Sequence, residues 1–228
     1  MKKVIIVFKS HLDNGYTDLS KQVLHNYCTS MLDNMLDTCE ATAALPEGSR
    51  YVWTMPAWLL YHIRNSSDTN PLNKKRLDDC ISRRQVVWIQ TPFTIHTEFS
   101  GLEEIIRGFH FSDELSRLYH YTPLSAKMTD VPGHTSYLAS LLNRQGVKFM
   151  PLGCNPCCMP PDVPTLFWWQ GSDGKQILTM YNKGSYGSSI LPPQGWKYPV
   201  WLYLAQTNDN LGCHTKEEVE KLLSTVRK

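Results

Sequence analysis

Stretches of strand character alternate with stretches of helical periodicity about seven times along this chain of 228 residues. The first apolar stretch, residues 4–8, has no polar alternation, which is typical of a strand buried on both faces of a parallel sheet. Strands that alternate with helices are joined most simply by crossovers into one parallel sheet. We therefore predict an α/β fold in a single domain, residues 1–228. Its expected architecture is a seven-stranded parallel β/α barrel of the TIM type, fully or incompletely closed.

Apolar runs, caps and turn residues give the expected positions of the elements. Strands are expected at residues 4–8, 51–55, 86–89, 125–130, 147–150 and 200–205, with a hairpin or an extended strand at 166–169 and 177–181. Helices are expected at residues 18–43, 57–64, 71–83, 135–145 and 216–226. Two further helices are expected between residues 100 and 120, one opened by a capping box at Ser100 and Glu103 and the other capped by Ser112.

Charge and composition exclude several classes of partner. The net charge is +2 with dispersed Lys and Arg, which gives no electrostatic footprint for nucleic acid, and no apolar run is long enough to span a bilayer. Seven cysteines, an odd number, and an opening apolar run too short for a secretory signal predict reduced thiols and a cytoplasmic location. The cluster Cys154, Cys157 and Cys158 lies among prolines and lacks the second pair of a zinc ribbon.

A histidine and an aspartate follow the first expected strand. His11 and Asp13 are two residues apart, so in extended chain they project from the same face, at the carboxyl end where parallel β/α folds place their sites. An imidazole and a carboxylate are ligands for zinc or a similar divalent ion. Gly15 allows a turn, and Tyr16 offers an aromatic face beside the expected metal.

Further polar groups follow the later strands. The candidates for binding a substrate are His96, Glu98 and His134, and His134 is also expected to support Asp130 by hydrogen bonding. Asp130 and Asp209 add two carboxylates at the same rim. Such a pair suits glycoside cleavage, in which one group attacks or stabilises the anomeric carbon and the other protonates the leaving oxygen.

Three segments resemble motifs of glycoside hydrolase family 38, the retaining α-mannosidases. Residues 11–16, His-Leu-Asp-Asn-Gly-Tyr, are similar to the His-x-Asp-x-Gly-Trp zinc motif of that family. Residues 129–135, Thr-Asp-Val-Pro-Gly-His-Thr, resemble its Asp-x-x-Gly-His-Ser/Thr segment, and residues 208–212 occupy the place of its acid/base loop. The order and spacing of these segments agree with the family across nearly the whole chain.

The resemblance implies a role for each matching residue. His11, Asp13 and Asp130 would hold one zinc ion per chain, and Asp130 would also attack the anomeric carbon of a carbohydrate substrate. Asp209 would act as the acid/base, and Tyr16 would replace the tryptophan beneath the sugar. The expected activity is that of a zinc-dependent retaining glycosidase of the α-mannosidase type.

The chain also departs from the family pattern. Lys9 stands where many members have a histidine before the motif. The family's fourth zinc ligand is a histidine further downstream, which only His214 or His134 could replace here. We therefore expect the N-terminal part of a longer enzyme, with a site that is weakened or inactive in isolation.

Three alternatives remain open from the sequence. A metal-dependent deacetylase or other carbohydrate hydrolase would use similar ligands, but the His-x-x-x-His motif of polysaccharide deacetylases is absent. A non-catalytic sugar-binding chain is compatible with the missing ligand. An α/β domain whose rim residues serve only as turns and caps is the third alternative.

Overall fold

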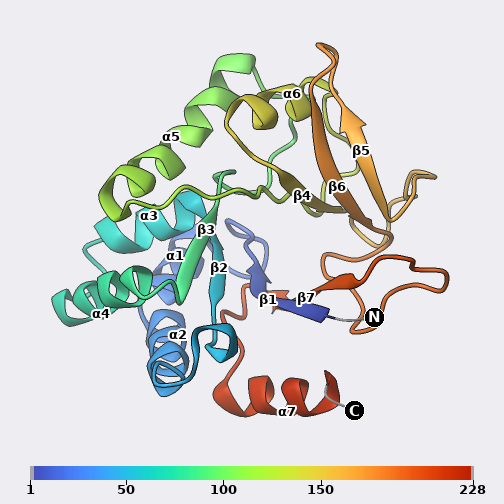
Figure 1. The fold of residues 1–228 in the computed structure, drawn as a ribbon. Helices are drawn as coiled ribbons and strands as arrows, with labels where there is room; N and C mark the ends of the chain where they lie inside the picture. Colours follow the sequence, from blue (N-terminus) through green and yellow to red (C-terminus); the bar gives the residue numbers. More distant parts are fainter. Residues whose placement is uncertain (1–2, 227–228) are drawn as a thin grey trace. The chain divides into compact units, whose positions relative to one another are not determined.

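The structure is a computed structural model, and it describes residues 3–226 (Figure 1). Close contacts group the chain into two compact units. Among the described residues, the first unit contains residues 3–55, 62–87 and 187–226, and the second contains residues 56–61 and 88–186. No helix within residues 3–226 has the length and apolar character needed to cross a membrane.

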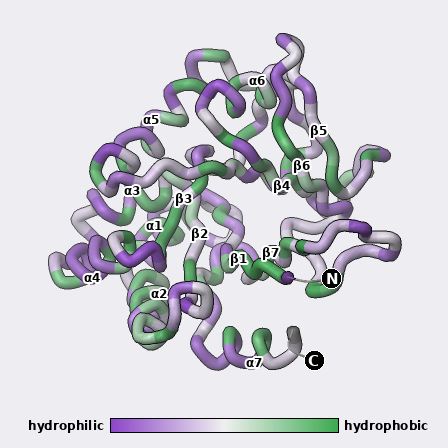
Figure 2. The backbone as a smooth tube through the Cα atoms, in the orientation of Figure 1, coloured by the Kyte–Doolittle hydropathy of each residue, from purple (hydrophilic) through white to green (hydrophobic). Residues whose placement is uncertain are grey.

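The first unit is built on a sheet of four strands in the order β3-β2-β1-β7. The bounds are β1 Lys3–His11, β2 Trp53–Pro56, β3 Val86–Ile89 and β7 Val200–Asp209. β1 runs parallel to both of its neighbours. The strands carry largely hydrophobic residues, as Figure 2 shows for β1 and β3. β3 is almost entirely buried, but β1 is buried only from Phe8 to His11 and exposes Ile5, so the predicted burial of residues 4–8 on both faces is wrong.

Helices α1 (Ser20–Cys28), α2 (Ser30–Ala41), α4 (Pro71–Ser82) and α7 (Lys216–Val226) belong to the same unit, and α3 (Ala57–Asn65) follows β2 directly. The predicted helix over residues 18–43 is divided at Thr29, whose φ of −123° and ψ of −104° lie outside the helical region. The start of α4 is confirmed: the Asn70 side chain accepts a hydrogen bond from Asn73 N, and Pro71 occupies the first turn.

The second unit contains a mixed sheet of three strands in the order β4-β6-β5. The bounds are β4 Phe149–Gly153, β5 Leu166–Gln170 and β6 Gln176–Asn182. β4 is parallel to β6, whereas β5 and β6 form an antiparallel hairpin. Helices α5 (Leu102–Tyr119) and α6 (Tyr137–Arg144) contribute to the core of this unit, in which Phe109, Leu138 and Met150 are almost fully buried.

The strand pairing confirms the α/β class but corrects the predicted seven-stranded parallel barrel. The strands within residues 3–226 form one sheet of four and one of three, and β5 runs antiparallel because the short hairpin turn reverses the chain. The expected strand at residues 125–130 is reduced to isolated parallel bridges, which pair Ser125 with Phe149 and Met128 with Leu152.

The two helices predicted between residues 100 and 120 are a single helix, α5. Its first turn is closed by Glu104, whose carboxylate accepts a hydrogen bond from Gly101 N. Ser112, which we expected as a cap, is fully buried: its hydroxyl accepts a hydrogen bond from Trp88 Nε1 and donates one to Gln90. A tertiary partner therefore satisfies this serine, so the helix continues through it.

Candidate functional site

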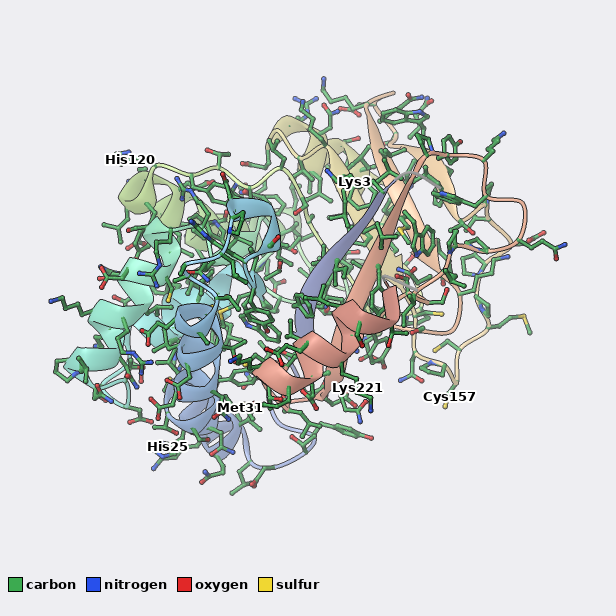
Figure 3. The ribbon with its side chains drawn as sticks, turned by 60° about the horizontal axis from the view of Figure 1, so that its bottom comes forward. Lys3, His25, Met31, His120, Cys157 and Lys221 are labelled. Carbon is green, nitrogen blue, oxygen red and sulfur yellow. The ribbon has the colours of Figure 1, made fainter. Side chains whose placement is uncertain are left out.

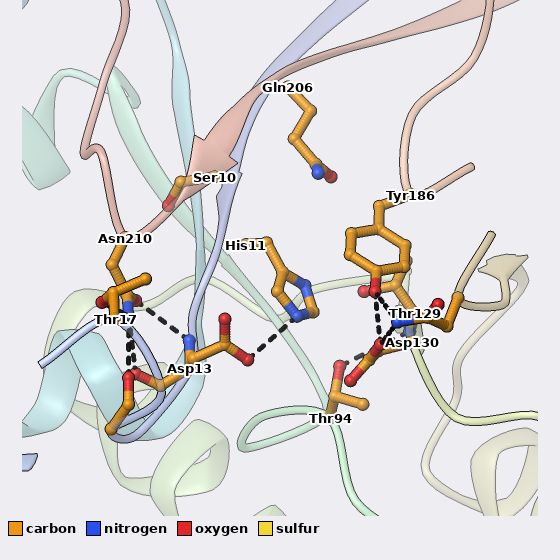
Figure 4. A network of polar contacts seen from close by, with 12 residues as sticks. Ser10, His11, Asp13, Thr17, Thr94, Thr129, Asp130, Tyr186, Gln206 and Asn210 are labelled. Carbon is orange, nitrogen blue, oxygen red and sulfur yellow. Dashed lines mark hydrogen bonds and ion pairs between the residues drawn. The ribbon is translucent and has the colours of Figure 1, made fainter. Parts of the chain in front are cut away.

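Three candidate ligands meet at the carboxyl ends of β1 and β7 in the first unit. His11 and Asp209 are the last residues of these strands and lie opposite each other in the pairing. The Nε2 atom of His11 is 3.3 Å from Oδ1 of Asp13 (Figure 4). One ligand atom from each of the three side chains lies within 4.8 Å of the other two. The His11 side chain is only 3% exposed, whereas that of Asp13 is 21% exposed.

This donor set fits a small divalent cation. Zinc binds imidazole nitrogen and carboxylate oxygen at about 2.0–2.2 Å in a tetrahedral arrangement, which places two ligand atoms about 3.3 Å apart. The separation between His11 Nε2 and Asp13 Oδ1 equals that value. The three side chains therefore form a possible metal-binding triad.

A fourth residue, Asn210, holds this end of the unit together. Its Oδ1 accepts a hydrogen bond from Asp13 N (2.9 Å), and its Nδ2 donates to Asp13 O (3.0 Å) and to Thr17 Oγ1 (2.8 Å). Its backbone N–H donates to His11 O (3.0 Å). Sequence reasoning missed Asn210. The available signal was an asparagine directly after a strand, since Asn adopts the left-handed conformation, here φ +53°, more readily than most residues.

The loop after β1 turns tightly before α1. Gly15 has φ +120° and its N–H donates to Asp13 O, while Thr17 N donates to Gly15 O. Tyr16, at φ +60°, is 89% exposed. The predicted turn at Gly15 is present, and its geometry leaves the Tyr16 ring in solvent.

Buried polar groups lie close to the triad in the same unit. The Ser10 hydroxyl lies 3.2 Å from the Tyr27 hydroxyl. Burial raises the pKa of Tyr27 to about 12, with the charges of Asp13 and Asp209 acting in the same direction, although the contact with Ser10 lowers it. Tyr27 is therefore neutral at any ordinary pH. Lys9, which replaces the expected histidine, is buried, and its Nζ donates to Gln206 Oε1.

Asp130 belongs to the second unit and is held by two residues that the sequence did not indicate. Its Oδ1 accepts hydrogen bonds from Asn155 Nδ2 (3.0 Å) and from the Tyr186 hydroxyl (Figure 4). Asn155 follows β4 and Tyr186 follows β6. Both residues could have been predicted as site residues, because polar residues that follow strands often form sites. Asn155 was missed because it lies between Cys154 and Cys157, and the cysteines alone were considered in that segment.

His134 contacts a threonine in the second unit. Its Nδ1 lies 3.1 Å from Thr97 Oγ1, which also accepts a hydrogen bond from Thr135 N. Burial lowers the pKa of His134 to about 4, and the positive charge of His96 acts in the same direction. His134 is therefore a neutral imidazole at pH 7. The expected hydrogen bond from His134 to Asp130 is not among its contacts, since Thr97 is the partner that its ring nitrogen meets.

Glu98 lines a pocket of about 490 Å³ in the second unit. The other residues that line it come from the start of α5 and from the start of α6: Thr97, Ser100, Leu102, Ile105, Thr135, Ser136, Tyr137 and Leu141. The Glu98 carboxylate lies 3.0 Å from the position that a Cβ on Gly133 would occupy. His96 and Glu98 are both exposed, so either side chain is accessible to a ligand.

The whole chain, residues 1–228, matches the family model described as "Glycosyl hydrolases family 38 N-terminal domain". The chain belongs to this family. No curated protein matches the sequence. Residues 11–16, 129–135 and 208–212, which resemble family 38 motifs, therefore lie in a member of that family, although the match itself assigns no residue a role.

Solved structures agree with the family 38 fold. An α-mannosidase from Enterococcus faecalis V583 shares 16% identity at a TM-score of 0.71, over 100% of this chain and 27% of that chain. A second family 38 protein from Enterococcus faecalis shares 13% identity at a TM-score of 0.58, over 99% of this chain and 27% of that chain. A 4-α-glucanotransferase from Thermococcus litoralis shares 11% identity at a TM-score of 0.57, over 92% of this chain and 34% of that chain. These identities support likeness of fold. The chain spans about a quarter of the length of the two family 38 structures.

His214, one of the two residues considered as a replacement for the family 38 histidine ligand, packs against Phe8 with ring centroids 5.3 Å apart. Burial lowers its pKa. Within the described residues it is not part of the group formed by His11, Asp13 and Asp209.

Proposed function

We propose that this family 38 chain carries the metal-binding catalytic site of a retaining glycoside hydrolase of the α-mannosidase type, which acts on a carbohydrate. The observation that carries the proposal is the cluster of His11, Asp13 and Asp209 at the ends of two adjacent parallel strands. One imidazole and two carboxylates provide both metal ligands and groups for acid/base chemistry at a glycosidic bond. The α-mannosidase description of a solved relative supports the choice of sugar.

We infer that His11 and Asp13 hold one zinc ion per chain and that Asp130 is a further ligand, as the family 38 resemblance implies. When bound, such an ion supplies Lewis-acid and template chemistry to adjacent sugar hydroxyls. The burial of His11 supports this role, because a buried ring is held in one orientation.

We also infer how the two carboxylates divide the reaction. The Asp130 carboxylate attacks the anomeric carbon, while Asp209 gives a proton to the leaving oxygen and later removes one from water. The closeness of Asp209 to His11 and Asp13 offers it a second role, as a metal ligand. Asp209→Asn separates the two roles. If Asp209 is only the acid/base, the variant keeps its zinc, and its activity is restored with a substrate whose leaving group needs no proton. If Asp209 is a metal ligand, the variant loses the zinc.

Four side chains are proposed to contact the sugar. The exposed ring of Tyr16 offers a stacking face, and Glu98 lines a pocket of a size usual for small ligands. His96 is exposed close to Glu98 in the sequence, and His134, as a neutral imidazole, can donate or accept a hydrogen bond.

The decisive experiment measures zinc by elemental analysis of the purified chain and of Asp13→Ala. We expect about one zinc per chain, lost in the variant, and slow hydrolysis of an aryl α-mannoside by the wild type alone. The matched control is Asp68→Ala, because Asp68 pairs with His25 at 2.9 Å in an exposed pair that belongs to no group of three candidate ligands within residues 3–226. Zinc retained in Asp13→Ala would contradict the proposed site. Zinc with sugar binding but no hydrolysis would leave a binding function only.

Two further parts of the proposal concern the whole protein. The chain is proposed to be the N-terminal part of a longer enzyme, which fits its coverage of 27% of each family 38 structure. A cytoplasmic location is proposed because the seven cysteines are all free thiols, as expected in a reducing compartment. Thiol titration of the freshly purified protein should count seven.

A further inference from the structure

Three side chains of the second unit form a closed set of hydrogen bonds around Asp130. The Tyr186 hydroxyl donates to Asp130 Oδ1 and accepts from Asn155 Nδ2, at 2.9 Å. Asn155 Nδ2 also donates to the same Asp130 oxygen, at 3.0 Å. Each donor in the set thus has an acceptor, and two of them converge on one carboxylate oxygen (Figure 4).

The orientation of the Asn155 amide follows from its other contact. Its Oδ1 accepts a hydrogen bond from the backbone N–H of Cys157 at 2.9 Å. Since a backbone N–H can only donate, this oxygen must face Cys157, and the NH₂ group must face Asp130 and Tyr186. Cys157 is an exposed free cysteine (Figure 3), and its contact with Asn155 is made by its backbone N–H.

The backbone of Asp130 is held as firmly as its side chain. Asp130 has φ +78°, a conformation that non-glycine residues adopt only at an energetic cost. Asn155 N donates to Asp130 O at 3.0 Å, so one residue contacts both the main chain and the carboxylate. A strained backbone that is stabilised from two directions gives the side chain one preferred direction.

We propose that Asn155 and Tyr186 are positioning residues that fix the Asp130 carboxylate in one orientation for attack on an anomeric carbon. The inference rests on the proposed function, in which Asp130 is the nucleophile. Two donors to one oxygen restrict rotation about the bond to the carboxylate, so the reacting oxygen does not have to be ordered during the reaction. The expected effect is on the rate of bond formation rather than on sugar binding.

The contact itself is tested without any substrate. In a ¹⁵N-labelled chain, the side-chain amide signals of Asn155 are assigned by their loss in Asn155→Ala. We expect Tyr186→Phe to shift these signals and to speed exchange of their hydrogens at least several-fold. Tyr181→Phe is the matched control, because Tyr181 lies in the same unit but outside this set of hydrogen bonds. An Asn155 amide that does not respond to Tyr186→Phe would overturn the inference.

The positioning role is tested with a mannose-configured epoxide that labels a nucleophilic carboxylate. The Asp130 oxygen bonds to the carbon at the anomeric position, the carbon–oxygen bond of the epoxide breaks, and the released oxygen takes up a proton. Peptide mass analysis locates the label and measures its rate. In Tyr186→Phe and Asn155→Ala, we expect the maximal labelling rate to fall about 10-fold or more, with the half-saturating concentration unchanged within about 2-fold.

Comparison of Tyr186→Phe with Tyr186→Leu separates the hydroxyl from the packing of the ring. If only the packing of the ring mattered, Tyr186→Phe would be labelled at the wild-type rate, and that result would overturn the inference. Wild-type rates in both Tyr186→Phe and Asn155→Ala would do the same. A wild type that is not labelled at Asp130, although the amide signals respond as expected, would instead refute the proposed nucleophile and so the catalytic part of this inference.

Discussion

A single buried amide, that of Asn210, connects the strand that carries Asp209 to the loop that carries Asp13. Its Oδ1 accepts one hydrogen bond from Asp13 N, and the two hydrogens of its NH₂ group are shared among Asp13 O, Gly15 O and Thr17 Oγ1. Its backbone N–H donates to His11 O. Partners that orient metal ligands in this way affect metal affinity although they do not touch the metal. The position of Asp13 relative to His11 therefore depends on a residue almost 200 positions away in the chain.

Replacement of Asn210 should weaken the metal site more than it weakens the fold. Asn210→Gly is the informative variant, because glycine keeps the φ of +53° without strain and removes only the side chain. We expect a loss of about 10- to 100-fold in zinc affinity and of about 3 kcal/mol in the free energy of unfolding, about 1 kcal/mol per hydrogen bond. Titration calorimetry and denaturant unfolding measure the two effects. The control is Asn208→Gly, since Asn208 is exposed.

His134 should make stability depend on pH. Its pKa is lowered to about 4 in the folded chain, against about 6.5 when unfolded, so between these values the unfolded chain binds more protons. Stability should therefore rise with pH across this window and be lost as the pH falls from about 6.5 towards 4. Unfolding at pH 5 and pH 7 should show that His134→Asn removes part of this dependence. An unchanged dependence would contradict the expectation, and the exposed His110 provides a control variant, His110→Asn.

The starts of two helices could be predicted from the sequence, because the residues that form each cap lie within one helical turn of each other. The start of α4 follows from Asn70 and Pro71, and the start of α7 from Thr215 and Glu218, which exchange hydrogen bonds. The division at Thr29 and the continuity of α5 could not be predicted from the sequence. In the second case the deciding contact joins Ser112 to Trp88, 24 positions earlier, and such partners are invisible before the fold is known.

The cap of α4 should be worth about 1 kcal/mol of stability, because the Asn70 side chain satisfies a backbone N–H that has no partner within the helix. Asn70→Ala should lower the free energy of unfolding by that amount. Ser136→Ala is the control: Ser136 precedes α6 in the same position but makes no capping hydrogen bond. Denaturant unfolding of both variants measures the difference, and equal losses would show that the Asn70 bond contributes nothing specific.

At the scale of the whole molecule, the α/β class and the family could be predicted because both depend on patterns that are local in the sequence. The alternation of strands and helices set the class, and residues 11–16 and 129–135 indicated the family that the full-length match bears out. The division into two sheets and the reversed direction of β5 could not be predicted, since strand pairing depends on contacts between distant segments. Asn155, Tyr186 and Asn210 each follow a strand, but their roles were missed because the groups that they contact lie in distant segments of the chain.

Zinc should stabilise the folded chain, and the distribution of that effect should identify the ligands. Since the triad lies within the first unit, we expect zinc at about 1,000 times its dissociation constant to add about 4 kcal/mol to the free energy of unfolding. Hydrogen exchange with mass analysis should then slow at residues 9–17 and 206–212, which carry the ligands and the Asn210 contacts.

If Asp130 is also a ligand, hydrogen exchange at residues 128–132 should slow in the same titration, and Asp130→Asn should abolish the slowing at these residues alone. Protection that rises at residues 128–132 but not at 206–212 would instead favour Asp130 over Asp209 as the third ligand. Uniform protection across the chain would contradict a metal site at these residues.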